Sequence, residues 1–92
     1  MEQVTVTIGA QSWEFDPDAV NGLDAWEFTS AVGADLLDVL AEIARIVDEG
    51  APLPFHLAVV GRWLAVRQNG NPLAPFAGVA AMTTIGGARG DE

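Results

Sequence analysis

The chain has 92 residues, of which 50% are hydrophobic and 18% are charged, and its formal net charge is −9. This length predicts one domain, and this hydrophobic content excludes intrinsic disorder as the global state. The absence of cysteine excludes disulfides, thiolate metal sites and thiol nucleophiles. The cationic residues are four arginines, too few to neutralise phosphates, so neither nucleic acid nor an anionic membrane is expected as a partner.

The first element expected is a β-hairpin over about residues 3–15. Residues 3–8 alternate between apolar and polar side chains, and residues 12–15 alternate again after a turn at Gly9. The apolar face would consist of Val4, Val6, Ile8, Trp13 and Phe15. Because a two-stranded hairpin is not stable alone in water, this face must pack on helices.

A first helix is predicted over about residues 22–32. Asn21 is a plausible N-cap with Asp24 three residues later, and Gly33 suits the position just past the helix end. Its buried side is expected to hold Leu23, Trp26, Phe28, Ala31 and Val32.

The second helix, over about residues 35–49, has the clearest amphipathic pattern. Gly50 ends it and Pro52 prevents continuation. Core spacing is shown by Leu36, Leu37, Leu40, Ile43, Ala44 and Val47. The polar stripe consists of Asp38, Glu42, Arg45 and Glu49.

Two further helices are predicted over about 54–68 and 73–84. Between Phe55 and Val66 only His56 and Arg62 are polar, so this helix is either central or covered by a second molecule. In the last segment apolar residues recur every third position, which fits either a short helix closing the core or an ordered arm on another surface. Residues 86–92 are expected to form a flexible tail.

These elements predict an α+β fold, with an N-terminal β-hairpin packed on a bundle of three to four helices. Residues 1–85 would form this single small domain. No signal peptide or membrane-spanning segment is expected.

Charge is unevenly distributed along the chain. Eleven of the thirteen acidic residues precede Gly50, whereas residues 51–90 carry only three charged residues, all arginine. One part of the surface should therefore be acidic and another weakly basic and very apolar. This distribution favours contact with other proteins, and the apolar excess predicts self-association or a permanent partner.

The residues that could carry chemistry do not form a recognisable site. Glu14, Asp16 and Asp18 lack the further ligands and glycine turn of a calcium loop, so they indicate a solvated turn. His56 is the only histidine and has no nucleophile or carboxylate nearby in sequence. No catalytic, cofactor-binding or metal-binding residue is predicted, and enzymatic activity is not expected.

Protein-binding residues are predicted on the third and fourth helices. The sequence fits Trp63 equally well as a core residue and as an interface anchor. Trp13 and Trp26 are expected in the core. The candidate binding residues are Phe55, Arg62, Trp63, Val66, Leu73, Phe76, Val79 and Met82.

The order of these segments resembles the tail assembly chaperones of phages with long, flexible tails. The resemblance covers about residues 3–76. It rests on the hairpin, on the segments 23–33 and 35–43, and on Leu57-Ala-Val-Val-Gly-Arg-Trp-Leu-Ala-Val-Arg67 followed by Asn69-Gly70-Asn-Pro72. The proline-punctuated stretch 72–88 departs from the family pattern.

The resemblance implies a non-catalytic protein of the host cytoplasm that is absent from the mature virion. It would bind the tape measure protein, keep it soluble and help recruit tail-tube subunits. This chain would correspond to the short form of such a chaperone, which is often made beside a frameshifted long form.

The alternative is a small acidic inhibitor that mimics DNA and blocks a basic protein. Asp35, Asp38, Glu42 and Glu49 on one helix face motivate this hypothesis. Binding by mimicry would depend strongly on salt, whereas apolar client binding would not.

Overall fold

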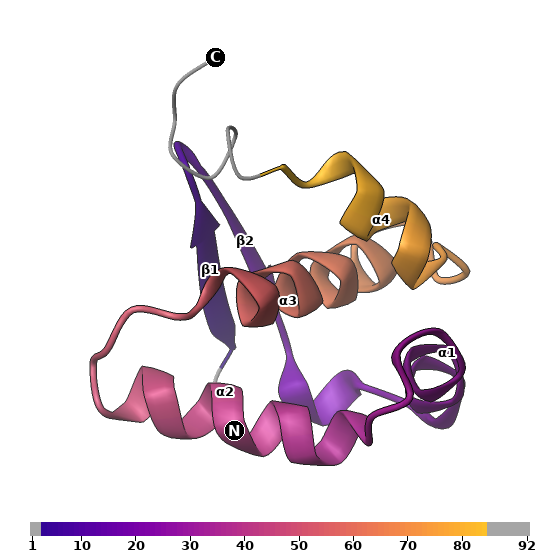
Figure 1. Cartoon of the computed structure of the whole chain (residues 1–92), viewed down its shortest axis with the longest axis horizontal. Helices are drawn as coiled ribbons and strands as arrows, with labels where there is room; N and C mark the ends of the chain where they lie inside the picture. The colour runs from indigo at the N-terminus through magenta and orange to yellow at the C-terminus, as the bar shows by residue number, and fades with distance from the viewer. Residues whose placement is uncertain (1–2, 85–92) are drawn as a thin grey trace.

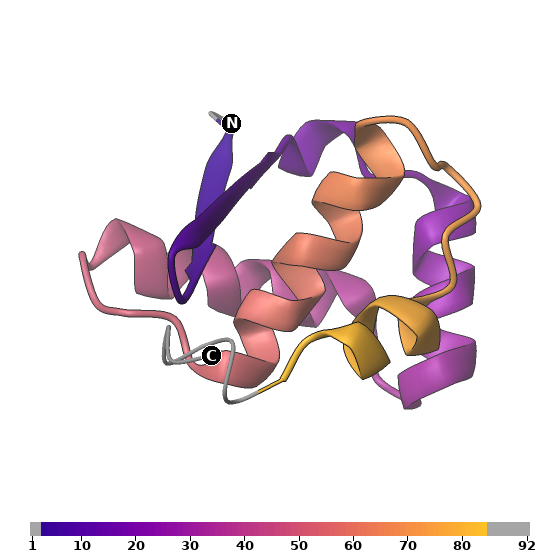
Figure 2. The same cartoon turned by 90° about the horizontal axis from the view of Figure 1, so that it is seen from above.

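The computed structural model describes residues 3–84. An antiparallel hairpin of β1 (Val4–Ile8) and β2 (Gln11–Phe15) is followed by a short 3-10 helix, η1 (Pro17–Ala19). Four helices follow: α1 (Gly22–Val32), α2 (Leu36–Asp48), α3 (Phe55–Gln68) and α4 (Phe76–Met82). In both views α3 lies in the middle of the molecule, with the hairpin towards one end and α1 and α4 towards the other (Figure 1, Figure 2). The predicted α+β architecture is confirmed, whereas the tail predicted at 86–92 lies outside the described residues.

The hairpin forms as its alternation predicts. Val4 pairs with Phe15 and Ile8 with Gln11, across a two-residue turn in which Gly9 takes a positive φ of 62°. Four of the five expected inward residues are buried and Trp13 is half-buried. This face rests on α3 so closely that a Cβ at Gly61 would lie 2.4 Å from Val6 Cγ1. Only glycine fits at that crossing.

Helix α3 is apolar nearly all round because it is the centre of the molecule. Its buried residues are Leu57, Ala58, Val59, Val60, Gly61, Trp63, Leu64, Ala65 and Arg67. The helix begins after Pro54, whose missing N–H is not needed in the first turn. Of the two readings of this helix, the structure supports the central one.

Helix α1 has the predicted ends but a different buried face. Asn21 and Asp24 form a reciprocal capping box, and Gly33 ends the helix in the left-handed region at φ 83°. The buried residues, however, are Asp24 and Phe28, while Leu23 and Val32 are exposed and Trp26 is 75% exposed. The prediction that Leu23, Trp26 and Val32 lie in the core is therefore wrong.

The rotation of α1 is fixed by an ion pair in the interior. Asp24 Oδ1 accepts a hydrogen bond of 2.6 Å from Arg67 Nε, and both side chains are at most 5% exposed. Arg67 Nη1 also donates to the carbonyl of Ala74 at 2.7 Å, and Trp63 Nε1 donates to the same oxygen at 2.9 Å. This network ties α1, α3 and the α3–α4 connection together, and turns Trp26 outward.

Helix α2 is capped by Asp35, whose Oδ1 accepts from Leu37 N at 3.0 Å, so the helix begins one residue after the predicted start at 35. The polar stripe is exposed as expected, but the core face is displaced towards Leu36, Ile43 and Ile46. Leu37 is 69% exposed and Val47 is also exposed, so their expected core positions are wrong. The helix lies at the edge of the domain and buries only a narrow part of its apolar surface.

Helix α4 is shorter than the predicted 73–84 segment. It begins after Pro75 and ends at Met82, and its Val79 is buried against the core. The structure thus has the short helix that closes the core, the first of the two alternatives for this segment. Leu73 and Met82 are 72% and 67% exposed, on either side of the packed part.

Candidate functional site

An apolar groove lies where helices α1, α2, α3 and α4 meet. It has a volume of about 570 Å³. Its apolar lining is formed by Phe28, Val32, Ala34, Val39, Leu57, Val60 and Phe76. A groove of this size and chemistry can receive apolar side chains from another molecule.

An aromatic cluster supports the floor of this groove. The rings of Phe28 and Phe76 meet edge to face with centroids 5.2 Å apart. Trp63 packs behind both, at 6.0 Å from Phe28 and 5.4 Å from Phe76. Because Trp63 is fully buried and hydrogen-bonded, it holds the two lining rings in place and does not itself reach the groove.

One rim of the groove is acidic. Asp35, Asp38 and Glu42 line it, at spacings of three and four residues that place them along one side of α2. Within residues 3–84, the side chain of Asp38 has no hydrogen-bond or ion-pair partner. His56, exposed in the first turn of α3, is the other polar lining residue. The rim therefore presents carboxylates beside an apolar floor.

Arg45 partly neutralises the negative charge at the outer end of this rim. Its guanidinium donates to Glu42 and to Glu49, one turn to either side. The hydrogen bond from Arg45, together with its charge, holds the pKa of Glu42 below the ordinary value, and the same two carboxylates raise the pKa of Arg45. All three side chains are largely exposed, so this triad is only weakly stabilising.

The predicted binding residues do not share one surface. Trp63 and Val79 lie in the core, which removes both as direct contacts for a partner. Arg62 is half-buried, with its guanidinium 4.7 Å from the centre of the Trp13 ring and a 2.8 Å hydrogen bond to Thr83 Oγ1. Phe55 lines a small recess beside the hairpin turn.

Of the remaining predicted residues, Phe76 alone lines the apolar groove. Val66 lines a different recess near Trp13, while Leu73 and Met82 are exposed before and at the end of α4. Sequence reasoning missed the contributions of Phe28, Val39 and Val60 to the groove. The feature of the sequence that indicates the groove is the acidic stripe of α2, which forms one of the groove's rims.

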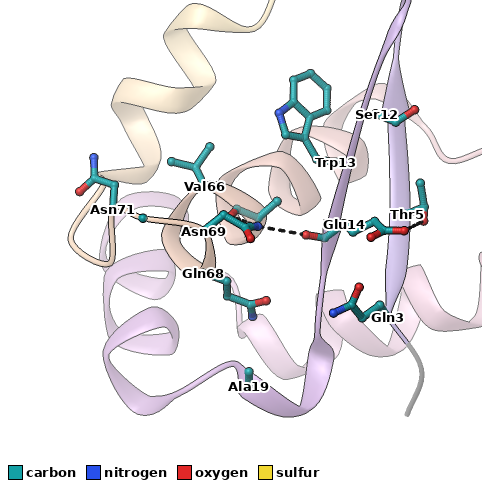
Figure 3. A pocket seen from close by; sticks show the side chains of 12 residues that line it. Gln3, Thr5, Ser12, Trp13, Glu14, Ala19, Val66, Gln68, Asn69 and Asn71 are labelled. Atoms are coloured by element: carbon teal, nitrogen blue, oxygen red, sulfur yellow. Dashed lines mark hydrogen bonds between the residues drawn. The ribbon is translucent and has the colours of Figure 1, made fainter.

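A second, more polar recess of about 980 Å³ runs along β2 (Figure 3). The side chains of Gln68 and Asn69 at the end of α3 bind the β2 backbone there. Gln68 accepts from the Asp16 amide at 2.8 Å and donates to its carbonyl at 2.9 Å, and Asn69 Nδ2 donates to the Glu14 carbonyl. The polar groups in this recess thus cover a strand edge.

Within residues 3–84 there is no group of three or more metal-ligating side chains that could hold an ion. No helix in the same range is long and apolar enough to cross a membrane. Comparison of the chain with protein-family models, curated proteins and solved structures gave no match. The geometry of the groove is therefore the feature of this protein that best indicates a function.

Proposed function

We propose that this protein is a non-catalytic chaperone-type binding protein that receives an amphipathic helical segment of a client in the groove between its four helices. The observation that carries this proposal is the pairing of an apolar floor with a carboxylate rim. An apolar helix face supplies affinity by filling such a floor through residues spaced three, four and seven apart. Basic residues beside that face would meet Asp35, Asp38 and Glu42.

On the resemblance to tail assembly chaperones, we propose phage tail assembly as the setting in which this binding occurs. In that setting the client is the tape measure protein of a phage with a long, flexible tail, and the tail-tube protein is recruited afterwards. The protein would then act in the host cytoplasm and leave before the virion is complete. A tape measure gene directly downstream, in an overlapping frame, is the arrangement that this setting requires.

The structure gives less support to the alternative of a DNA-mimicking inhibitor. Arg45 lies between Glu42 and Glu49 and neutralises part of the acidic stripe on which mimicry would depend. Mimicry also gives no role to the apolar floor beside the stripe. A salt titration separates the two, because mimicry loses most of its affinity at high salt while apolar docking retains most of it.

The test uses two synthetic amphipathic helical peptides with the same leucine face. One carries lysines beside that face and the other carries glutamates. We expect the lysine peptide to bind more tightly in isothermal titration calorimetry. Asp38→Asn should weaken its binding by about two- to fivefold, the range of one exposed ion pair.

Asp48→Asn is the matched control for that substitution. It removes an exposed carboxylate from the same helix, but Asp48 does not line the groove. Val39→Ala and Leu37→Ala form the corresponding apolar pair, because Val39 lines the groove and Leu37 does not. Equal affinity for the two peptides, or equal losses within each pair of variants, would contradict the proposal.

A further inference from the structure

The two outer edges of the hairpin differ in how their backbone groups are satisfied. Ile8 and Gln11 flank a two-residue turn, so their amides and carbonyls must bond each other. Along both strands every second residue then points outward. On β1 the outward backbone groups belong to Thr5 and Thr7, and on β2 to Ser12 and Glu14, followed by Asp16.

Part of the β2 edge is covered within the chain, because Gln68 and Asn69 bind the backbone of Asp16 and Glu14. Among residues 3–84, nothing covers the β1 edge in this way. The sheet described there has two strands, and no hydrogen bond from that part of the chain reaches the outward amides or carbonyls of Thr5 and Thr7. Their side-chain hydroxyls bond across the hairpin to Glu14 and Ser12.

The β1 edge also lacks several of the features by which proteins normally prevent strand pairing. The strand is Val-Thr-Val-Thr-Ile, regular and rich in β-branched residues, with no proline, bulge or charge. Beside it, a groove of about 790 Å³ separates β1 from α2. Its lining includes the apolar Val4, Ala41, Ala44 and Val47 together with the charged Arg45 and Asp48, and Val47 is exposed although apolar.

We propose that this edge pairs with the same edge of a second copy of the chain, forming a four-stranded antiparallel sheet across a two-fold axis. The symmetric placement of Thr5 and Thr7 about Val6 makes the edge complementary to itself and so selects this occupant, and charge selects this site. Two copies of a chain with net charge −9 repel each other, and residues 3–13 carry no charge. Two copies can therefore pair along β1 with no charged side chain on the paired strands themselves.

The direction of the outward groups restricts the pairing register. Antiparallel strands bond through residues whose amides both point outward, so Thr5 of one copy faces Thr7 of the other when the axis passes beside Val6. The interface is then isologous, and it forms the same bonds twice. Because a stable interface buries about 800 Å² per partner, more than a short strand supplies, the groove beside α2 must contribute apolar area.

The test places charges on the exposed Thr5 and Thr7 side chains. In T5K/T7K, each new lysine would face another lysine across the axis, whereas in T5K/T7E each would face a glutamate. Both variants carry the same change beside Glu14, so the contrast lies at position 7. We expect the dimer dissociation constant of T5K/T7K, from sedimentation equilibrium, to exceed that of T5K/T7E by about tenfold or more.

The difference in net charge between the two variants favours the opposite result. T5K/T7K is the less negative variant, so two copies of it would repel each other less overall. Hydrogen exchange of the unmodified protein gives an independent readout. The Thr5 and Thr7 amides should become protected as protein concentration rises, while the Val6 amide, bonded within the hairpin, should be protected throughout. A protein that stays monomeric, a dimer with unprotected Thr5 and Thr7 amides, or equal association of the two variants would overturn the proposal.

Discussion

Two sets of ion pairs in this protein use the same chemical groups under opposite conditions. Asp24 and Arg67 meet in the interior, whereas Arg45 meets Glu42 and Glu49 on the surface of α2. The interior pair determines how α1 is rotated and which of its apolar residues face solvent. The surface set leaves the fold unchanged and adjusts the charge at the groove rim. Burial, and not the identity of the partners, separates a structural ion pair from a peripheral one.

The largest effect should come from leaving one interior charge without its partner. Arg67→Met removes the guanidinium and leaves the Asp24 carboxylate without its cationic partner. The Ala74 carbonyl then accepts from one donor instead of two. We expect the free energy of unfolding in urea to fall by about 3–5 kcal/mol. Arg45→Met should lower it far less, because the Arg45 side chain and its two carboxylate partners are exposed to solvent. Similar losses for the two variants would remove the distinction between the pairs.

A second contrast tests the rotation that the interior pair imposes on α1. Trp63 is fully buried in the aromatic cluster, and Trp63→Ala should cost about 3–5 kcal/mol of stability. Trp26 is exposed, so Trp26→Ala should change stability by no more than about 0.5 kcal/mol. Thermal unfolding followed by circular dichroism measures both. A large loss of stability for Trp26→Ala would mean that α1 turns its Trp26 side towards the core, as its apolar spacing predicts.

The smallest effect concerns the surface set and pH. The pKa of Glu42 is lowered in the folded protein by its hydrogen bond to Arg45. The stabilisation it contributes is therefore present above the unfolded-state pKa and is lost as pH falls through the lower, folded-state pKa. An NMR titration of the Glu42 carboxyl should show this lowered pKa, and Arg45→Gln should return it towards the ordinary value. An unchanged Glu42 titration in that variant would indicate that Arg45 is not the cause.

The candidate groove was only partly predictable, for a reason visible in α1 and α4. Phe76 was expected to bind a partner and does line the groove, and the acidic stripe of α2 was recognised from its spacing. Phe28 and Val60 were not recognised as groove residues, because a pattern along one helix does not say where four helices leave a gap. Trp63 and Val79 were placed at an interface for the same reason, although both lie in the core.

The sequence alone determined the hairpin, the cap at Asn21, and the approximate extent of four helices. These features depend on alternation, glycine conformations and hydrogen bonds between residues close in the chain. Tertiary structure decided the rotation of α1, the burial of α3 and the position of the groove. Each of these depends on contacts between distant residues, such as the 43-residue separation of Asp24 and Arg67. An apolar pattern assigns charged side chains to solvent, and so it could not anticipate that a buried ion pair would turn Trp26 outward.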